Sequence, residues 1–270
     1  MGRYDLLLVT KPSSASFSHF FAERYQSAKS SISEDLVIIK QTFEQQGVGT
    51  LQTIPGAAGG VKYIPYISEE EADLIIGELC SLFENPDRIL PGGYLYMTDL
   101  LSNPRHINGA GRLFASVFAR QPIDAVMTVA TKGIPLAYAV ANYLDVPVVI
   151  ARKDNKVTEG PTVSINYVSG SSKRIQTMTL AKRSLPEGSN VLIIDDFMKA
   201  GGTIQGMMSM LEEFKANVVG IGVLVESTDI EERLINNFVS LIRLSEVDVK
   251  EKAIQVEKEI IHWHHLMKGL

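Results

Sequence analysis

The order of aliphatic and polar residues changes along the chain and separates two kinds of pattern. From residue 91 onward, aliphatic runs alternate with segments of helical periodicity: "DAVMTVA" precedes "IPLAYAVANYL" and "VPVVIA", and "VLIID" precedes "TIQGMMSMLEEF" and "VVGIGVLVES". Such alternation is typical of βαβ units, which build a parallel sheet with both faces covered. Residues 91–270 are therefore predicted to form an α/β domain.

One segment of that domain has a different pattern. The stretch "TVSINYVSGSSKRIQTMTL" lies between "VPVVIA" and "VLIID" and contains two polar runs joined at Ser169, Gly170 and Ser171. Two such runs around a Gly/Ser turn predict a β-hairpin. We expect this hairpin to project from the domain rather than to be buried.

Residues 1–66 predict short helices followed by a hairpin. Helices are expected around residues 3–9, in "FSHFFAERYQS" and in "SISEDLVIIKQTFEQQG". The next stretch, "GTLQTIPGAAGGVKYIP", has two β-type arms around a Gly/Ala-rich tip. Three helices and a hairpin are the order of a winged helix-turn-helix, so a DNA-binding domain is predicted here. Residues 67–90, with the acidic "SEEEADLIIGELCSLF", predict a connecting helix.

The third expected helix has the clearest local signals. Ser31 and Glu34 match an S-x-x-E capping box, and Gly47 stands where the helix is expected to end. One apolar stripe runs along it, formed by Ile32, Leu36, Ile39 and Phe43. Its N-terminal turn would present polar residues outward, as a recognition helix does in the major groove.

Candidate DNA contacts are the polar residues of that turn and the basic residues around it. Side chains of this kind bind base edges and backbone phosphates. The simpler interpretation is that they are ordinary helix-surface residues. The candidates are Arg24, Lys29, Ser30, Ser31, Ser33, Lys40 and Lys62.

Composition narrows the class of protein. A length of 270 residues exceeds the usual size of one domain, and the apolar runs are too short for a membrane span. The net charge of −5 argues against a surface that is positive all over. The one cysteine, Cys80, excludes an internal disulfide, which fits a reducing cytoplasm. His262, His264 and His265 are interpreted as a solvated helix end, and no metal site is expected.

The stretch "VLIIDDFMKAGGT" contains the strongest candidate site. Asp195 and Asp196 would emerge at the carboxyl end of a buried parallel strand, where open α/β sheets bind ligands, and two carboxylates can accept hydrogen bonds from a vicinal diol. The turn that follows, with Thr203, would direct backbone N–H groups at a phosphate. Diol and phosphate together predict a ribose 5-phosphate ligand. The alternative is a capping aspartate before a glycine-rich turn; a Walker loop is excluded because G-x-x-x-x-G-K-[ST] is absent.

This stretch resembles the phosphoribosyl diphosphate (PRPP) signature of type I phosphoribosyltransferases, and its opening is especially similar to that of xanthine phosphoribosyltransferase. The segment "VATKGIP" is similar to the family's diphosphate loop, and "ARKDNK" lies where its flexible loop begins. The resemblance implies a PRPP site formed by Tyr94, Thr131, Lys132, Gly133, Arg152, Lys153, Asp195, Asp196, Phe197, Lys199, Ala200, Gly201, Gly202 and Thr203. It leaves open whether magnesium accompanies PRPP, and it implies no redox cofactor.

From about residue 17 to 250 the chain also resembles the bacterial purine operon repressors, regulators with a phosphoribosyltransferase-like effector domain. The similarity extends over "ERYQSAKSSISEDL", "GAAGGVKYIP", "ILPGGY", "VATKGIPLAYA", "ARKDNKVTEGPTVSINYVSGS" and "DDFMKAGGT". The transferases usually carry small residues where Lys199 and Ala200 stand, and no hood over a nucleobase is legible after "VVGIGVLVES". We therefore expect PRPP binding without catalytic turnover and assign no catalytic residues.

Together these observations predict a homodimeric, cytoplasmic regulator that binds double-stranded operator DNA of purine biosynthesis and salvage genes, with PRPP as its effector. The alternatives are an active purine phosphoribosyltransferase and an RNA-binding attenuation regulator on the same fold. The sparse positive charge, with six Lys/Arg against five Asp/Glu in residues 1–66, favours a dimer, because affinity grows with the number of phosphates contacted.

Overall fold

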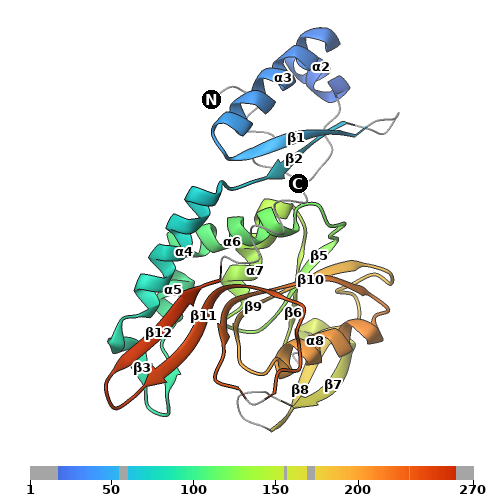
Figure 1. Ribbon diagram of the computed structural model, residues 1–270. Coiled ribbons are helices and arrows are strands. Elements are labelled where there is room, and N and C mark those ends of the chain that lie inside the picture. Colours follow the sequence, from blue (N-terminus) through green and yellow to red (C-terminus); the bar gives the residue numbers. More distant parts are fainter. Residues whose placement is uncertain (1–17, 55–59, 155–156, 169–173, 231, 260–270) are drawn as a thin grey trace.

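The computed structural model describes residues 18–54, 60–154, 157–168, 174–230 and 232–259 (Figure 1). A small N-terminal unit lies at one end of the molecule, and a larger unit built on a central sheet lies at the other. The helices are α2 Ser18–Tyr25, α3 Lys29–Gln45, α4 Glu69–Phe83, α5 Thr98–Ser102, α6 Pro104–Phe118, α7 Ile134–Leu144 and α8 Gly202–Glu213, with 3-10 turns η1 Pro86–Arg88 and η2 Val157–Glu159. The strands are β1 Gly49–Ile54, β2 Gly60–Pro65, β3 Ile89–Leu90, β4 Tyr94–Leu95, β5 Ala125–Val129, β6 Val148–Ala151, β7 Thr162–Val168, β8 Ile175–Ala181, β9 Asn190–Met198, β10 Asn217–Ser227, β11 Val239–Asp248 and β12 Ala253–Lys258.

The N-terminal unit packs α2 and α3 against an antiparallel hairpin, β1–β2. The predicted stripe of α3 is confirmed: all four of its residues are buried, and Phe43 meets Tyr63 of β2 edge to face, with ring centroids 5.4 Å apart. The winged order is therefore present from α2 onward. The helix expected around residues 3–9, the hairpin tip at residues 55–59 and the histidines at 262–265 lie outside the described residues.

The predicted capping box of α3 is wrong. The helix begins at Lys29, with Ala28 as N-cap and no side-chain cap, so Ser31 lies inside the first turn. The amide of Ile32 donates to the carbonyl of Ala28 at 3.1 Å, which extends the helix one turn earlier than its side-chain signals suggested. Ile32 in this first turn is fully buried in the core of the unit, so tertiary packing stabilises the turn in place of a side-chain cap.

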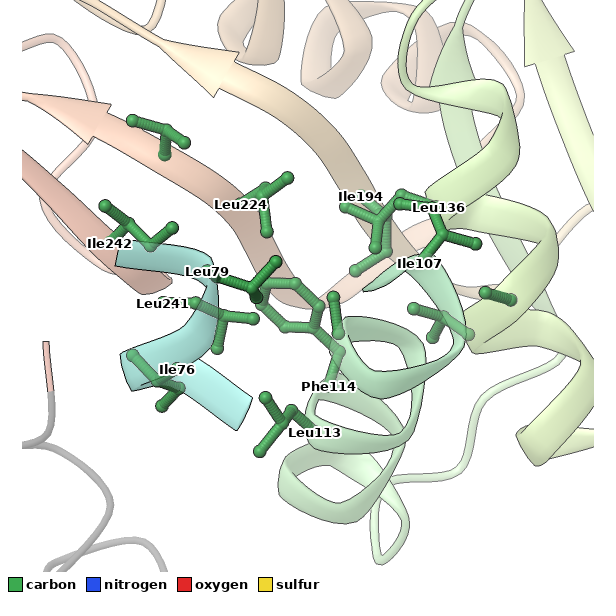
Figure 2. Packing of buried hydrophobic residues seen from close by; sticks show 14 of the residues in the cluster. Ile76, Leu79, Ile107, Leu113, Phe114, Leu136, Ile194, Leu224, Leu241 and Ile242 are labelled. Carbon is green, nitrogen blue, oxygen red and sulfur yellow. The ribbon is translucent and has the colours of Figure 1, made fainter. Parts of the chain in front are cut away.

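The larger unit is built on one six-stranded sheet in the order β12-β11-β10-β9-β5-β6. All neighbouring pairs are parallel except β11 and β12, which are antiparallel. Helices α4, α6 and α7 cover one face, where Phe114, Leu136 and Ile194 belong to one buried cluster (Figure 2). Helix α8 and the β7–β8 hairpin cover the other face. The predicted α/β domain with a doubly covered parallel sheet is thus confirmed.

The hairpin expected to project from this domain instead has one buried face. Strands β7 and β8 pair antiparallel from Thr162 opposite Ala181, but Tyr167, Met178 and Leu180 are buried against α8. A β-carbon on Gly206 of α8 would lie 2.8 Å from the Tyr167 ring, so the missing side chain makes room for the hairpin. The polar Ser164, Asn166 and Thr177 are exposed on the other face, and the tip of the hairpin lies outside the described residues.

Helix α4, which connects the two units, is docked along its length on the larger one. Ser68 caps it by accepting a hydrogen bond from the amide of Glu71, and Ile76, Leu79 and Phe83 join the core beneath the sheet. Lys258 of β12 pairs with Asp73 at 2.8 Å. Among the described helices, none has the length and hydropathy to cross a membrane.

Candidate functional site

The carboxyl ends of β5, β6 and β9 meet at one edge of the sheet, because these strands are neighbours and parallel. A cavity of about 740 Å³ opens there. It is lined by Val129, Ala130, Thr131, Lys132, Arg152, Lys153, Asp154, Asp195, Asp196, Phe197 and Thr203. The structure therefore brings together residues from the three segments that the sequence singled out.

The two aspartates lie within the last four residues of β9, which continues to Met198, and they occupy different environments. Asp195 is only 6% exposed and its Oδ1 accepts a hydrogen bond from the Asp196 amide at 3.0 Å, whereas Asp196 is half-buried. Burial raises the pKa of Asp195 well above its usual range, and the negative charge of Asp196 raises it further. Burial also raises the pKa of Asp196. Buried acceptors of this kind favour a ligand that donates hydrogen bonds or carries a cation.

Basic residues surround the same space. The positive charge of Lys153 opposes the rise in the pKa of Asp195, and the positive charge of Lys132 opposes the rise in the pKa of Asp196. Each aspartate is therefore influenced by one of the two lysines. Arg152 follows β6 and its Nε lies 3.3 Å from a carboxylate oxygen of Glu159. A mixture of carboxylates and cations suits a ligand with both hydroxyl and phosphate groups.

The glycine-rich turn after β9 opens helix α8. Gly201 has φ +93°, a conformation that other residues rarely adopt, and it is the N-cap of α8 without a side-chain cap. The first amides of α8, beginning at Gly202, therefore lack a capping side chain, and Thr203 lines the cavity beside them. A helix N-terminus in this state binds anions readily.

A segment that the sequence did not single out supports this turn from behind. The amide of Leu234 donates to the carbonyl of Ala200 at 2.9 Å, and a β-carbon on Gly201 would lie 2.9 Å from Ile235. Arg233 holds this segment through Glu226, which is buried in β10. Only a partner distant in sequence reveals this support, so no local pattern could have predicted it.

Gly133 lies between Asp195 and the rest of the loop of residues 129–133, the segment that resembles a diphosphate loop and is called the diphosphate-type loop below. A β-carbon there would lie 2.2 Å from Oγ1 of Thr128 and 3.1 Å from Oδ1 of Asp195, so only glycine fits. The next residue begins helix α7. The loop of Thr131 and Lys132 is consequently held directly beside the buried carboxylate.

Two predicted residues line a neighbouring cavity instead. Tyr94 and Lys199 border a space of about 720 Å³, which shares Lys132, Asp196 and Phe197 with the first cavity. Lys199 lies 3.9 Å from Asp229, which the sequence analysis did not select. Residues of β11 and of the turn between β3 and β4 also line this cavity, so chain segments after β10 do border the site although the sequence showed no hood there.

The candidate DNA contacts belong to α2, α3 and β2 of the N-terminal unit, which lies at the other end of the molecule from α8 (Figure 1). Lys29, Ser30, Ser31 and Ser33 are exposed at the start of α3. Lys62 is half-exposed on β2, and Arg24 is exposed near the end of α2. Lys40 lies 3.8 Å from Glu44 one turn later, which neutralises part of its charge.

Comparison with protein families matches both units. Residues 97–259 match the family model of the phosphoribosyl transferase domain, and residues 4–65 match that of the N-terminal part of bacterial purine repressors. The chain is 66% identical over 250 residues to the purine biosynthesis transcriptional repressor PurR of Bacillus subtilis, covering 93% of this chain and 88% of that protein. It is 46% identical over 250 residues to the purine biosynthesis transcriptional activator PurR of Lactococcus lactis, covering 93% of this chain and 92% of that protein.

A solved structure supports the fold of the larger unit. The adenine phosphoribosyltransferase of Rhodothermus marinus aligns with a TM-score of 0.54 and 24% identity, covering 63% of this chain and 99% of that one. This level of identity supports the fold and not the activity.

Proposed function

Because the chain belongs to the family of bacterial purine repressors, we propose that it is a regulator of purine biosynthesis and salvage genes whose DNA affinity is controlled by PRPP. The N-terminal unit would bind duplex DNA, and the cavity at the carboxyl end of β9 would bind the effector. Such a regulator works in the cytoplasm, where bacterial DNA is found.

One observation carries the effector assignment. A single cavity combines the buried Asp195, the lysines Lys132 and Lys153, and the α8 N-terminus beside Thr203. The carboxylates would accept the ribose hydroxyls, the helix N-terminus would hold the 5-phosphate, and the loop of Thr131 to Gly133 would hold the diphosphate.

Magnesium would enter this site together with the ligand. Among the described residues, no group of three or more His, Cys, Asp or Glu side chains could hold a metal ion. Magnesium commonly binds through one or two carboxylates plus ligand phosphates, and Asp195 with Asp196 could supply the protein's share.

We propose further that the site binds PRPP without transferring its phosphoribosyl group. The two PurR proteins named above are regulators, and the long side chain of Lys199 stands where the transferases usually carry a small residue. The alternative, an active purine phosphoribosyltransferase, is tested by mixing protein, PRPP, magnesium and hypoxanthine, guanine or xanthine and separating the products. Nucleotide formation near the 10 s⁻¹ or so of a typical enzyme would establish the alternative.

The decisive experiment separates effector binding from DNA binding. In the double variant Asp195→Ala with Asp196→Ala, loss of charge-assisted hydrogen bonds worth roughly 1.5–3 kcal/mol each should lower PRPP affinity at least tenfold or so. Without PRPP, the variant should bind purine-gene control DNA like the unmodified protein, because α3 and β2 are unchanged. Its response to PRPP should disappear.

Gel-shift titrations across PRPP concentrations measure both effects. A PRPP response as steep as that of the unmodified protein would show that the aspartates are not the effector site. Stronger binding to the RNA transcript than to the duplex would favour the attenuation-type regulator instead.

A further inference from the structure

Arg112, on helix α6 of the larger unit, contacts the N-terminal unit directly. One of its terminal nitrogens lies 2.6 Å from a carboxylate oxygen of Glu71 on the connecting helix α4. The other donates to the carbonyls of Gly47 and Tyr66, each at 3.1 Å. The side chain is only 16% exposed, so a single partly desolvated guanidinium joins three segments.

One of these acceptors lies inside the N-terminal unit, and the other lies in the segment that joins this unit to α4. Gly47 has φ +64° and forms the turn between the recognition helix α3 and β1. Tyr66 lies between the end of β2 and the start of α4, in the segment that leaves the N-terminal unit. Because both backbone segments are held by the same nitrogen, the direction of α3 is tied to α6.

Helix α6 is in turn packed closely on the elements of the effector cavity. A β-carbon on Gly111, next to Arg112, would lie 2.6 Å from Cβ of Ala139, so α6 and α7 approach closely there. Helix α7 begins directly after Gly133 of the diphosphate-type loop. Phe114 of α6 also belongs to the same buried cluster as Ile194, the residue before Asp195 (Figure 2). Helix α6 therefore packs against α7, which follows one loop of the cavity, and shares a buried cluster with β9, which supplies the aspartates.

Two tyrosines complete the surroundings of Arg112. Tyr63 of β2 and Tyr143 of α7 both interact with its charge, and burial raises the pKa of Tyr63 to about 12. Tyr63 therefore stays neutral, and its hydroxyl donates to the carbonyl of Val48, beside Gly47. Within the described part of the chain, the carboxylate paired with Arg112 is that of Glu71, and the other acceptors are backbone carbonyls.

We propose that Arg112 is a positioning residue that fixes the orientation of the winged-helix unit and transmits effector occupancy to it. The transmission part rests on the proposed function; the positioning part does not. A shift of α6 driven by the diphosphate-type loop through α7 would move the guanidinium and with it the turn at Gly47. Close-packed elements of this kind pass on small displacements, because cores resist continuous deformation.

The structure offers a matched control on the same helix. Arg105 also pairs with a glutamate of α4, at 3.1 Å from Glu78, but its side chain is 78% exposed and its guanidinium bonds to α4 rather than to the N-terminal unit. Arg112→Gln and Arg105→Gln therefore remove equal charge from one helix face. Arg112→Lys keeps a charge for Glu71 but cannot reach three acceptors with a fixed fork, so it tests the geometry if the glutamine variant folds poorly.

Each variant is examined for PRPP affinity, for the ratio of DNA dissociation constants with and without PRPP, and for hydrogen exchange at residues 44–50 and 64–68. Allosteric ratios are typically about 5–150-fold. In Arg112→Gln and Arg112→Lys we expect unchanged PRPP affinity, a ratio within about twofold of one, and exchange roughly tenfold faster in both segments. Arg105→Gln should match the unmodified protein in all three.

Specific results would overturn the proposal. Transmission would be refuted if Arg112→Gln and Arg112→Lys kept the same ratio of DNA dissociation constants, with and without PRPP, as the unmodified protein. A loss of PRPP affinity would also refute it, since the arginine would then act on the cavity itself. If the unmodified protein shows no PRPP effect on DNA affinity, the proposed function fails. Hydrogen exchange at residues 44–50 and 64–68 then still tests the positioning role. Equal exchange rates in the Arg112 and Arg105 variants would refute it, and faster rates confined to the Arg112 variants would support it.

Discussion

At the scale of single residues, Asp195 shows how strongly burial changes a motif. The sequence analysis placed both aspartates at an accessible strand end, but Asp195 is enclosed by the diphosphate-type loop and by the sheet. Its carboxyl group is therefore costly to ionise in the folded protein, and a bound ligand would offset that cost through hydrogen bonds or an accompanying cation.

A pH-dependent stability difference follows for Asp195→Asn. The pKa of Asp195 is higher in the folded than in the unfolded protein, so between these two pKa values the folded state binds more protons. Stability falls as pH rises from the unfolded pKa toward the folded one, and asparagine abolishes this loss. We expect the variant to gain more stability at about pH 8 than at about pH 4.

Thermal unfolding of the variant and the unmodified protein at both pH values measures this difference. The exposed Asp87→Asn serves as control, because it removes equal charge without burial. A stability gain in Asp195→Asn that is the same at both pH values would contradict the assignment of a raised pKa.

At the scale of elements, helix α6 was missed by the sequence analysis, although it carries Arg112 and contacts α7. Its start did have a signal: Asn103 accepts a hydrogen bond from the amide of Arg105, and Pro104 stands in the first turn. Gly109 and Gly111 lower its intrinsic helix propensity. Gly111 is nevertheless required, because α7 approaches too closely for a side chain at this position. Packing therefore overrides propensity in this helix.

The contrast between these two glycines gives a stability prediction. Gly111→Ala would place a β-carbon 2.6 Å from Cβ of Ala139 and 2.9 Å from its backbone, so the helices must separate at a cost of about 1–3 kcal/mol. In Gly109→Ala the nearest atom is Cγ2 of Ile75 at 3.1 Å, on a side chain that can move. Because alanine has the higher helix propensity, the free energy of unfolding of this variant should stay unchanged or rise by up to roughly 1 kcal/mol.

Urea unfolding of both variants provides the comparison. The midpoint should fall in Gly111→Ala and stay constant or rise in Gly109→Ala. Equal midpoints would mean that α6 and α7 pack more loosely than the structure indicates.

At the scale of the whole molecule, we expect duplex binding to depend on few cations per chain. Lys29→Ala or Lys62→Ala should weaken DNA binding and reduce the slope of log affinity against log salt by about one unit for each phosphate that is no longer neutralised. Lys250→Ala, on the exposed turn between β11 and β12, should change neither and serves as control. DNA affinity measured at several salt concentrations tests this prediction. Unchanged slopes for both Lys29→Ala and Lys62→Ala would show that these lysines do not contact DNA phosphates.

A homodimer remains part of the same proposal. With Lys40 beside Glu44, fewer unneutralised cations face DNA than the sequence suggested, which strengthens the need for a second copy. Sedimentation of the protein alone and on DNA tests this. A single copy per operator would overturn it.

The hydrophobic patterns of the sequence determined the α/β class, the stripe of α3 and the strand that contains Asp195, because burial imposes those patterns locally. The glycine-rich turn before α8 was equally legible, because Gly201 adopts a conformation suited to glycine. Only the tertiary structure decided that Asp195 is buried, that residues 233–235 support the glycine-rich turn before α8, and that Arg112 holds Gly47 and Tyr66. Each of these depends on contacts between segments far apart in the chain, and no local pattern specifies which distant segments will meet.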